Sequence, residues 1–279
     1  MSATGDADLL IAARAALLDA LDALDAQRDA LVLIGAQAIY LHTGAAVVAL
    51  AEATKDSDLA VDPRALRDHP LLDDAMTGAG FHRDLLHPQP GSWLSRAGIP
   101  VDLMVPEALA GTSGRRGARI PPHSRHATRR TPGLEAAIVD HAPMTIIALD
   151  PNDGRSVKIA VAGPAALLVS KLHKLGERKD DPGRLIDKDA HDIYRLLVAT
   201  NTTELGNRLA ELSTDPFAGA ATAMAIGHLR NLFADPSALG PIMAGRAEQL
   251  VGEPEVVAAS AAALAGDLVA VLDQAPSER

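Results

Sequence analysis

The sequence predicts an α/β protein of the α+β kind, with a mixed sheet flanked by helices and a mostly helical C-terminal domain. Three observations predict it. Short, apolar, β-prone runs bounded by Gly, Pro or Asp are concentrated in the first 162 residues. Longer stretches repeat apolar side chains at the 3.6-residue period of a helix. With 279 residues, 48% of them apolar, the chain is long enough for one large or two modest domains.

The N-terminal half begins with a helix, followed by a strand, a turn and a second helix. Residues 7–30 repeat apolar side chains at helical spacing and predict an amphipathic helix. The short β-prone run 31–34 is closed by Gly35, and residues 36–42 again show a helical pattern. This order predicts a strand, a tight glycine turn and a helix that begins at the glycine.

Two further strands are predicted at 56–61 and 99–105, because both runs are β-prone and are bounded by proline. Residues 63–80 between them predict a helix. Residues 110–132 are rich in Gly, Pro, Ser and Arg and have no apolar period. We therefore expect this basic stretch to be an exposed loop that a ligand could order.

The second half begins with a hairpin and continues in helices. The β-prone runs 144–149 and 157–161 flank an Asn-Asp-Gly sequence that signals a hairpin turn. Pro164 is expected in the first turn of a helix that ends near Lys179, and another helix follows at 187–199. The remainder is alanine-rich and helical.

From these elements we expect two domains. The first, 1–162, contains the N-terminal helix, the sheet and the basic loop 110–132, and the second, 163–279, is mostly helical.

Composition excludes several classes of function. The chain has no cysteine, which excludes disulfides, thiolate nucleophiles and iron–sulfur clusters. No run approaches the roughly 18 apolar residues of a membrane helix, and the N-terminus lacks a signal-peptide pattern, so we expect a cytoplasmic protein without a membrane partner. A formal charge of −10 would also disfavour nucleic acid, unless the basic residues are gathered in one place.

Three aspartates are the strongest candidates for chemistry. Asp56 and Asp58 alternate in one predicted strand, so their side chains share a face with Cα atoms about 6 to 7 Å apart. Such like charges repel unless a cation lies between them, and hard ions such as Mg²⁺ prefer oxygen ligands. Asp102, flanked by apolar residues in another strand, also needs a partner. Together they predict a metal site for nucleotidyl transfer, although a surface turn alone carries a lone Asp-x-Asp equally well.

Gly35 fits the same chemistry, because a glycine turn before a helix N-terminus lets the backbone approach a phosphate. Three motifs resemble those of the DNA polymerase β-like nucleotidyltransferase superfamily, and within it the AbiEii/MenT group of toxin-like nucleotidyltransferases. They are Leu33-Ile34-Gly35-Ala36 as the glycine turn, Thr54-Lys55-Asp56-Ser57-Asp58-Leu59 as the acidic strand, and Val101-Asp102-Leu103 as the third acid. Residues 170–175 and 188–194 are similar to that branch's paired C-terminal helices.

The resemblance implies a polymerase β-like fold, an NTP substrate and Mg²⁺ or Mn²⁺ as cofactor. It implies metal binding by Asp56, Asp58 and Asp102, which with Lys171 and Asp189 form the expected catalytic set. The expected nucleotide-binding residues are Gly35, Ala36, Thr54, Ser57, Lys171 and Lys174. One departure is Ala36, because the family usually has Gly or Ser there and a serine hydroxyl can bind the triphosphate. Ser57 or Thr54 would then substitute, or nucleotide affinity would be weak.

Lys171, Lys174 and Arg178 are spaced to share one face of a helix, with Asp189 and Asp192 on one face of the next. One interpretation is a solvated surface with weak ion pairs. The other, favoured by the resemblance, is that Lys171 binds the triphosphate and Asp189 orients that lysine or the acceptor hydroxyl.

The basic loop carries six arginines and no acid. They are Arg115, Arg116, Arg119, Arg125, Arg129 and Arg130. In an acidic protein such segregation predicts contact with the phosphates of a nucleic acid. The alternatives are a loop without a partner, or one that neutralises the acidic pocket or holds the incoming nucleotide. His123 and His126 in the loop are a weak candidate for zinc, and Trp93 either stacks on a base or anchors the loop.

We therefore expect a metal-dependent nucleotidyltransferase that moves a nucleoside monophosphate to an acceptor hydroxyl. By resemblance the acceptor is a tRNA 3′ end, and the role is that of a toxin with an antitoxin partner or in phage defence. A small-molecule nucleotidyltransferase of the aminoglycoside or lincosamide type is one alternative, and a non-catalytic nucleotide- or partner-binding module is another.

Overall fold

The structure, a computed structural model, describes residues 3–44, 55–85, 88–112 and 116–274. The chain folds into two compact units. The first comprises Met1–Ala38 and Ala53–Ala162, and the second comprises Ile39–Glu52 and Gly163–Arg279. The chain thus passes from the first unit to the second for the last time after Ala162, at the expected domain boundary. Residues 39–52, however, also belong to the second unit.

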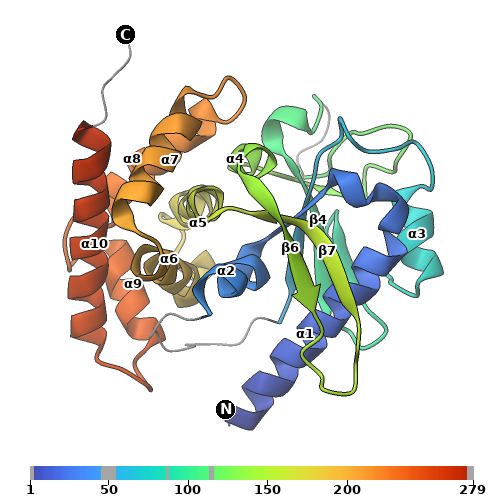
Figure 1. The fold of residues 1–279 in the computed structure, drawn as a ribbon, viewed down its shortest axis with the longest axis horizontal. Coiled ribbons are helices and arrows are strands. Elements are labelled where there is room, and N and C mark those ends of the chain that lie inside the picture. Colours follow the sequence, from blue (N-terminus) through green and yellow to red (C-terminus); the bar gives the residue numbers. More distant parts are fainter. Residues whose placement is uncertain (1–2, 45–54, 86–87, 113–115, 275–279) are drawn as a thin grey trace. The chain divides into compact units, whose positions relative to one another are not determined.

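The first unit is built on a seven-stranded sheet with the order β3-β4-β2-β1-β7-β6, and β5 also pairs with β4. Figure 1 labels β4, β6 and β7 of this sheet. The strands are β1 (Leu31–Ile34), β2 (Ser57–Val61), β3 (Ser92–Leu94), β4 (Pro100–Pro106), β5 (Arg129–Thr131), β6 (His141–Ile147) and β7 (Ser156–Ala162). The β1–β2 pair is antiparallel, whereas β1–β7 and β2–β4 are parallel. The expected mixed sheet is therefore confirmed, and β6–β7 is the expected hairpin.

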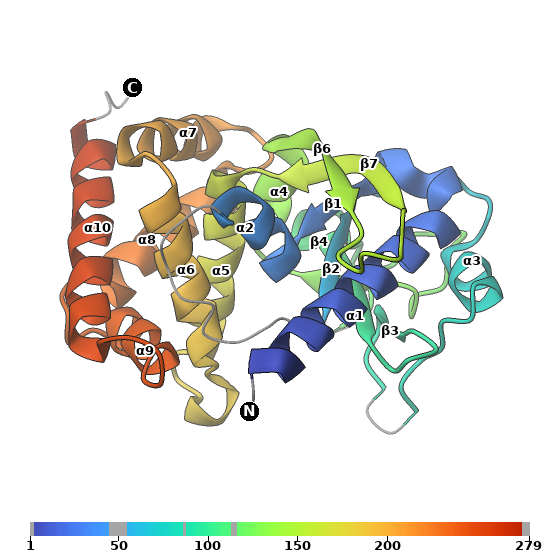
Figure 2. The ribbon, with the colours of Figure 1, turned by 60° about the horizontal axis from the view of Figure 1, so that its bottom comes forward.

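Helix α1 (Ala3–Ala23) covers the sheet at β2, β4 and β7 (Figure 2). Its apolar residues recur at helical spacing, and Leu17, Leu18 and Leu21 are completely buried. Burial of each such side chain stabilises the unit by about 1.5 to 3 kcal/mol. The helix expected at 63–80 is shorter, since α3 spans only Leu72–Gly78. The last helix of this unit is α4 (Glu135–Val139), and the short 3₁₀ segments are Asp25–Ala30 and Glu107–Leu109.

The second unit is helical, as expected. Its helices are α5 (Pro164–Arg178), α6 (Asp187–Ala199), α7 (Thr202–Thr214), α8 (Gly219–Leu232), α9 (Leu239–Ala247) and α10 (Pro254–Gln274), with a 3₁₀ turn at Pro182–Arg184. Helix α5 packs on α6 and α8, and α10 packs on α7 and α9. Helix α2 (Gly35–Thr43) contributes to both units, because the boundary falls after Ala38.

Helix α10 is long and apolar, a feature that the sequence analysis did not single out. Within the described residues it is the one helix long and apolar enough to cross a membrane, judged by length and composition only. A core helix of a soluble protein passes the same test. The helix packs on α7 and α9, and 33% of its apolar window is buried.

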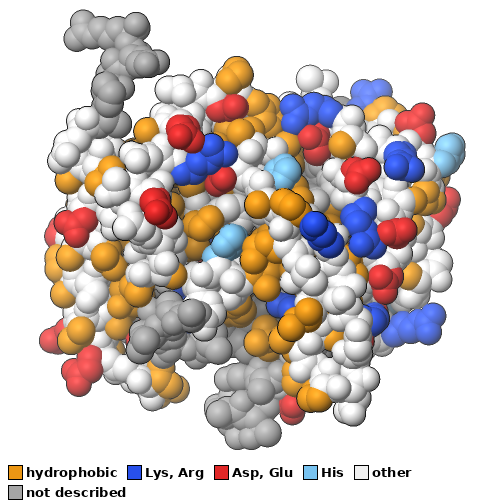
Figure 3. All heavy atoms as spheres, in the orientation of Figure 1, with side chains coloured by type: hydrophobic (Ala, Val, Ile, Leu, Met, Phe, Trp, Pro, Cys, Tyr) orange, Lys and Arg blue, Asp and Glu red, His pale blue; other side chains and the backbone are white. Residues whose placement is uncertain are grey.

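The basic stretch 110–132 is a loop with many exposed residues, as expected, but it is also partly buried and ends in a strand. Within the described part, Ala118, Ile120, Ala127 and Thr128 are buried, and residues 129–131 form β5. Small apolar side chains at irregular spacing produce this burial, which a search for a helix or strand period does not detect. On the face in Figure 3, basic and acidic side chains are interspersed over the sheet unit rather than separated.

Candidate active site

Gly35 lies against the carboxylate of Asp58. It follows the last residue of β1, Ile34, which is aligned with Asp58 on β2. Gly35 has φ +67°, and a Cβ at this position would lie 2.1 Å from Asp58 Oδ2. Both the backbone conformation and the space therefore require glycine. The consequence is that the N-terminus of α2 begins beside an acidic side chain.

Asp58 and Asp102 occupy the same row of the sheet. They are register partners on the parallel strands β2 and β4. Neighbouring strands lie about 4.8 Å apart, so two carboxylates in one row on one face are close enough to repel. Both side chains are partly buried. A cation beside this pair would reduce the repulsion.

Arg129 is one such cation. From β5 it donates through Nη2 to Asp102 Oδ2 at 2.7 Å, with the two side chains only 25% and 15% exposed. The other oxygen, Asp102 Oδ1, is buried without a hydrogen-bond partner among the described residues. Arg129 therefore compensates one oxygen of the acid and leaves the second for another ligand.

The residues fit a divalent metal at two of the three expected positions. Asp58 and Asp102 supply hard carboxylate oxygens, one of them buried and unsatisfied. Asp56 lies before β2 rather than inside it and is exposed. Within the described part of the chain, no three His, Cys, Asp or Glu side chains gather as a metal site. Metal binding by Asp56 thus stays a prediction.

The residues near the glycine turn that were expected to bind nucleotide lie in different environments. Ser57 is buried, and its hydroxyl donates to the carbonyl of Ala13 at 3.1 Å, on the α1 side of the sheet. Because neighbours in a strand face opposite ways, this geometry argues against Ser57 as a substitute for the missing serine at Ala36. Ala36 itself is buried, and Thr54 lies outside the described residues.

In the second unit, Lys171 belongs to a buried charge cluster. Its Nζ lies 2.9 Å from Asp189 Oδ1 and 2.7 Å from Asp192 Oδ2. The side chain is only 8% exposed. The solvated surface considered from the sequence is therefore wrong for Lys171, while its pairing with Asp189 is observed. Asp192, which shares the i, i+3 face of α6, is the partner that the expected catalytic set omitted.

Three more cations complete the cluster. Lys174 Nζ lies 2.9 Å from Asp189, Arg178 Nη1 lies 3.3 Å from the same acid, and Lys188 Nζ lies 3.3 Å from Asp192. Lys174 is 40% exposed, so it is the accessible lysine of the pair expected to bind triphosphate.

The cluster shifts the proton affinities of its members. Burial alone would raise the pKa of Asp189, but Lys171 and Lys174 hold it well below its usual value. Burial likewise opposes ionisation of Lys171, but Asp192 and Asp189 together raise its pKa above the usual range. The pKa of Asp192 is lowered by Lys171 and Lys188 in spite of its burial. All three groups are therefore charged at neutral pH.

The arginines of the basic segment have two kinds of environment. Arg129 pairs with Asp102, and Arg130 pairs with Glu107 at 2.8 Å. Arg116, Arg119 and Arg125 are exposed. Arg115 lies outside the described residues. Arg129 and Arg130 thus form ion pairs within the protein while the other described arginines are exposed, and phosphate contact by these residues stays a prediction.

The segment is anchored by the two side chains whose roles the sequence left open. Trp93 is buried, and its Nε1 donates to the carbonyl of Ala127 at 3.1 Å, which favours the anchor over base stacking. His123 accepts from the Leu72 amide at Nδ1 and donates to the Arg67 carbonyl from Nε2, at 3.2 and 3.0 Å. Both ring nitrogens are engaged, so the weak zinc candidate is not supported.

A mixed sheet with a glycine turn beside paired carboxylates is typical of nucleotidyl-transferring enzymes. In agreement, the model of a family described as nucleotidyltransferase matches residues 12–217. Since the match covers more than half of the chain, this protein belongs to that nucleotidyltransferase family. The matched region includes both the Asp58–Asp102 row and the Lys171 cluster. No curated protein and no solved structure gives a significant match.

Proposed function

We propose that this nucleotidyltransferase transfers a nucleoside monophosphate from an NTP to a hydroxyl of an RNA acceptor, and that the acceptor is a tRNA 3′ end. The observation that carries the proposal is the row formed by Gly35, Asp58 and Asp102, in which one buried carboxylate oxygen has no hydrogen-bond partner among the described residues. A phosphate-bearing acceptor is supported by the exposed arginines of the basic segment.

Asp58 and Asp102 would hold Mg²⁺ or Mn²⁺, with Asp56 as a further ligand. When bound, such an ion neutralises the phosphates and lowers the pKa of the attacking hydroxyl. Gly35 allows the α2 N-terminus to receive a phosphate, because it has no side chain at this point. Lys171 and Lys174 are proposed as triphosphate ligands from the sequence resemblance, and within the second unit Asp189 pairs with both lysines.

The biological role that we propose is that of a cytoplasmic toxin of the AbiEii/MenT type, controlled by an antitoxin protein. The support is the sequence resemblance. A small-molecule acceptor of the cationic aminoglycoside kind is disfavoured by the exposed arginines, because like charges repel.

The test is transfer of label from each of the four α-labelled NTPs to total cellular RNA, with Mg²⁺, with Mn²⁺ and with EDTA. We expect label in the tRNA band with metal and none with EDTA. Asp58→Asn and Asp102→Asn should abolish labelling. Absence of labelled RNA with every NTP would reject the RNA acceptor, and labelling that persists in Asp58→Asn would reject the site.

Asp74→Asn is the matched control. Asp74 is an exposed acid of α3 in the same unit, so this variant removes the same charge outside the site. It should label RNA at the wild-type rate. A non-catalytic binding module would show no transfer in any of these proteins.

A further inference from the structure

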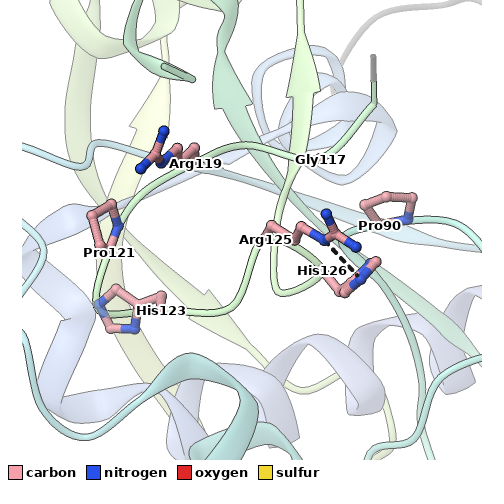
Figure 4. A pocket seen from close by; sticks show the side chains of 7 residues that line it. All are labelled: Pro90, Gly117, Arg119, Pro121, His123, Arg125 and His126. Atoms are coloured by element: carbon pink, nitrogen blue, oxygen red, sulfur yellow. Dashed lines mark hydrogen bonds between the residues drawn. The ribbon is translucent and has the colours of Figure 1, made fainter. Parts of the chain in front are cut away.

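A cavity of about 580 Å³ lies within the basic segment of the first unit (Figure 4). Its lining residues are Pro90, Gly117, Arg119, Pro121, His123, Arg125 and His126. The chain curls around this hollow because glycine allows close approach, since a Cβ on Gly117 would lie 2.2 Å from the carbonyl of Arg125. The Gly91 amide, next to the lining residue Pro90, donates to the carbonyl of the lining residue His126 at 2.9 Å.

Two arginines that line this cavity have no acidic partner among the described residues. Arg119 and Arg125 are exposed, and neither forms an ion pair with any acid in the described part of the chain. Arg125 Nε instead donates to His126 Nε2 at 3.2 Å (Figure 4). This differs from Arg129 and Arg130 in the same segment, whose charges are compensated by Asp102 and Glu107. The cavity therefore has the charge to bind an anion.

The walls indicate more than a simple anion. Pro90, Pro121 and the exposed ring of His126 offer flat, apolar faces, while the ring nitrogens of His123 are occupied by Leu72 and Arg67. The volume lies within the roughly 300 to 1,000 Å³ of small-ligand sites and is larger than a phosphate alone requires. Histidine rings and arginine are groups on which unpaired bases stack.

We propose that the cavity seats one nucleoside monophosphate unit, with its phosphate between Arg119 and Arg125 and its base against His126 and the prolines. This inference rests on the proposed function, in which the unit is part of the unpaired acceptor strand. Pro90 lies two residues before Ser92, the register partner of Asp102. At about 3.3 Å per residue and 4.8 Å between strands, cavity and acid are on the order of 10 Å apart.

The test uses a short fluorescein-labelled single-stranded RNA, with EDTA and no NTP, so that binding is measured apart from transfer. In Arg119→Ala/Arg125→Ala we expect anisotropy to show at least about tenfold weaker binding. Its log–log salt slope should be shallower by about 0.7, because roughly 0.7 is lost for the one phosphate contact. Arg208→Ala/Arg230→Ala, which removes two exposed arginines of the second unit, is the charge-matched control and should bind like the wild type.

Competition distinguishes the sources of the nucleotide. AMP should displace the RNA at a concentration at least about tenfold below that of inorganic phosphate, because the base adds stacking. Displacement by AMP indicates that a free nucleotide also enters, whereas displacement only by unlabelled RNA indicates a unit that must belong to a strand. Arg119→Lys/Arg125→Lys should recover part of the binding, which shows that loss in the alanine variant does not come from misfolding.

The proposal would be overturned if Arg119→Ala/Arg125→Ala and Arg208→Ala/Arg230→Ala lost RNA binding equally. It would also be overturned if inorganic phosphate displaced the labelled RNA as effectively as AMP and unlabelled RNA do. Asp58→Asn should bind RNA like the wild type. If the cavity variants bind normally while Asp58→Asn lacks transfer, the cavity is rejected and the proposed enzyme function stands. If transfer to RNA is absent in the wild type but the cavity variants lose binding, the proposed enzyme function is rejected and the cavity stands as an RNA-binding site.

Discussion

Gly35 determines where the Asp58 carboxylate lies, because no side chain fits between them. Its φ of +67° is in the left-handed region, and the space for a Cβ is taken by Asp58 Oδ2. Gly98 has a similar φ of +74°, but nothing lies within 4 Å of its missing Cβ. Comparing substitutions at the two glycines therefore distinguishes the effect of backbone strain from the effect of displacing the Asp58 carboxylate.

We expect Gly35→Ala to lose at least about 100-fold in transfer activity, because a misplacement of roughly 1 Å at a reacting centre costs this much. Gly98→Ala carries the same strain, about 1 to 2 kcal/mol, and should retain activity. Steady-state transfer rates and thermal melting of both variants provide the measurement. Equal activity loss in the two would show that strain alone, and not the position of Asp58, limits the enzyme.

Asp58 should also cost the folded protein stability. It lies in one row with Asp102, and two like charges at this distance repel. We expect Asp58→Asn to abolish transfer while its melting temperature, measured without metal, stays equal to or above that of the wild type. A lower melting temperature would instead give Asp58 a structural role.

Lys171 compensates two buried carboxylates at once. Lys171→Met should lower the free energy of unfolding by about 3 to 5 kcal/mol, because it leaves Asp189 and Asp192 undercompensated. Lys174→Met is the matched control, since Lys174 pairs with Asp189 but is 40% exposed, and it should cost no more than about 1 kcal/mol. Urea unfolding followed by circular dichroism measures both.

The same variant should change the acid sensitivity. The folded pKa values of Asp189 and Asp192 lie below their unfolded value of about 3.9, so both stabilise the fold above that pH and lose this contribution as pH falls through the folded pKa. Lys171→Met raises the folded pKa values and should flatten the fall of stability below about pH 4. Parallel pH curves for wild type and variant would contradict this account.

At the scale of elements, the basic segment shows what a sequence pattern can and cannot predict. Strands β1, β2 and β4 were predictable, because short β-prone runs that end at Gly or Pro have few other solutions. The fold of residues 116–128 was not, since its buried apolar residues are two alanines and one isoleucine without a period. Likewise, spacing alone placed Lys171 on a helix face, but only packing of α6 on α5 buries that face.

Trp93 lies in β3 and anchors the basic segment. Replacing Trp93 should therefore loosen that segment. Trp93→Phe removes the hydrogen bond to the Ala127 carbonyl and should cost about 1 kcal/mol, whereas Trp93→Ala should cost about 3 to 5 kcal/mol by leaving a cavity. Limited trypsin digestion should cut at Arg119 and Arg125 faster in the alanine variant. Equal digestion rates would mean that other contacts hold the segment.

At the scale of the whole molecule, each unit has a core of its own. Leu103 and Trp93 are buried within the sheet unit, and Leu196 and Leu209 within the helical unit. The chain passes between the units after Ala38, before Ala53 and after Ala162. A compact unit with its own core can unfold separately, so cooperativity between the two is a measurable property of this protein.

Trp93, the only tryptophan, makes its contacts inside the sheet unit and reports on that unit alone, whereas circular dichroism follows the helices of both. We expect Lys171→Met to shift the dichroism transition to lower urea while the fluorescence midpoint stays unchanged. Leu103→Ala, which should cost the sheet unit about 2 to 5 kcal/mol, should shift the fluorescence midpoint and leave a helical transition behind. If both variants instead move both probes together, the two units unfold as one cooperative unit.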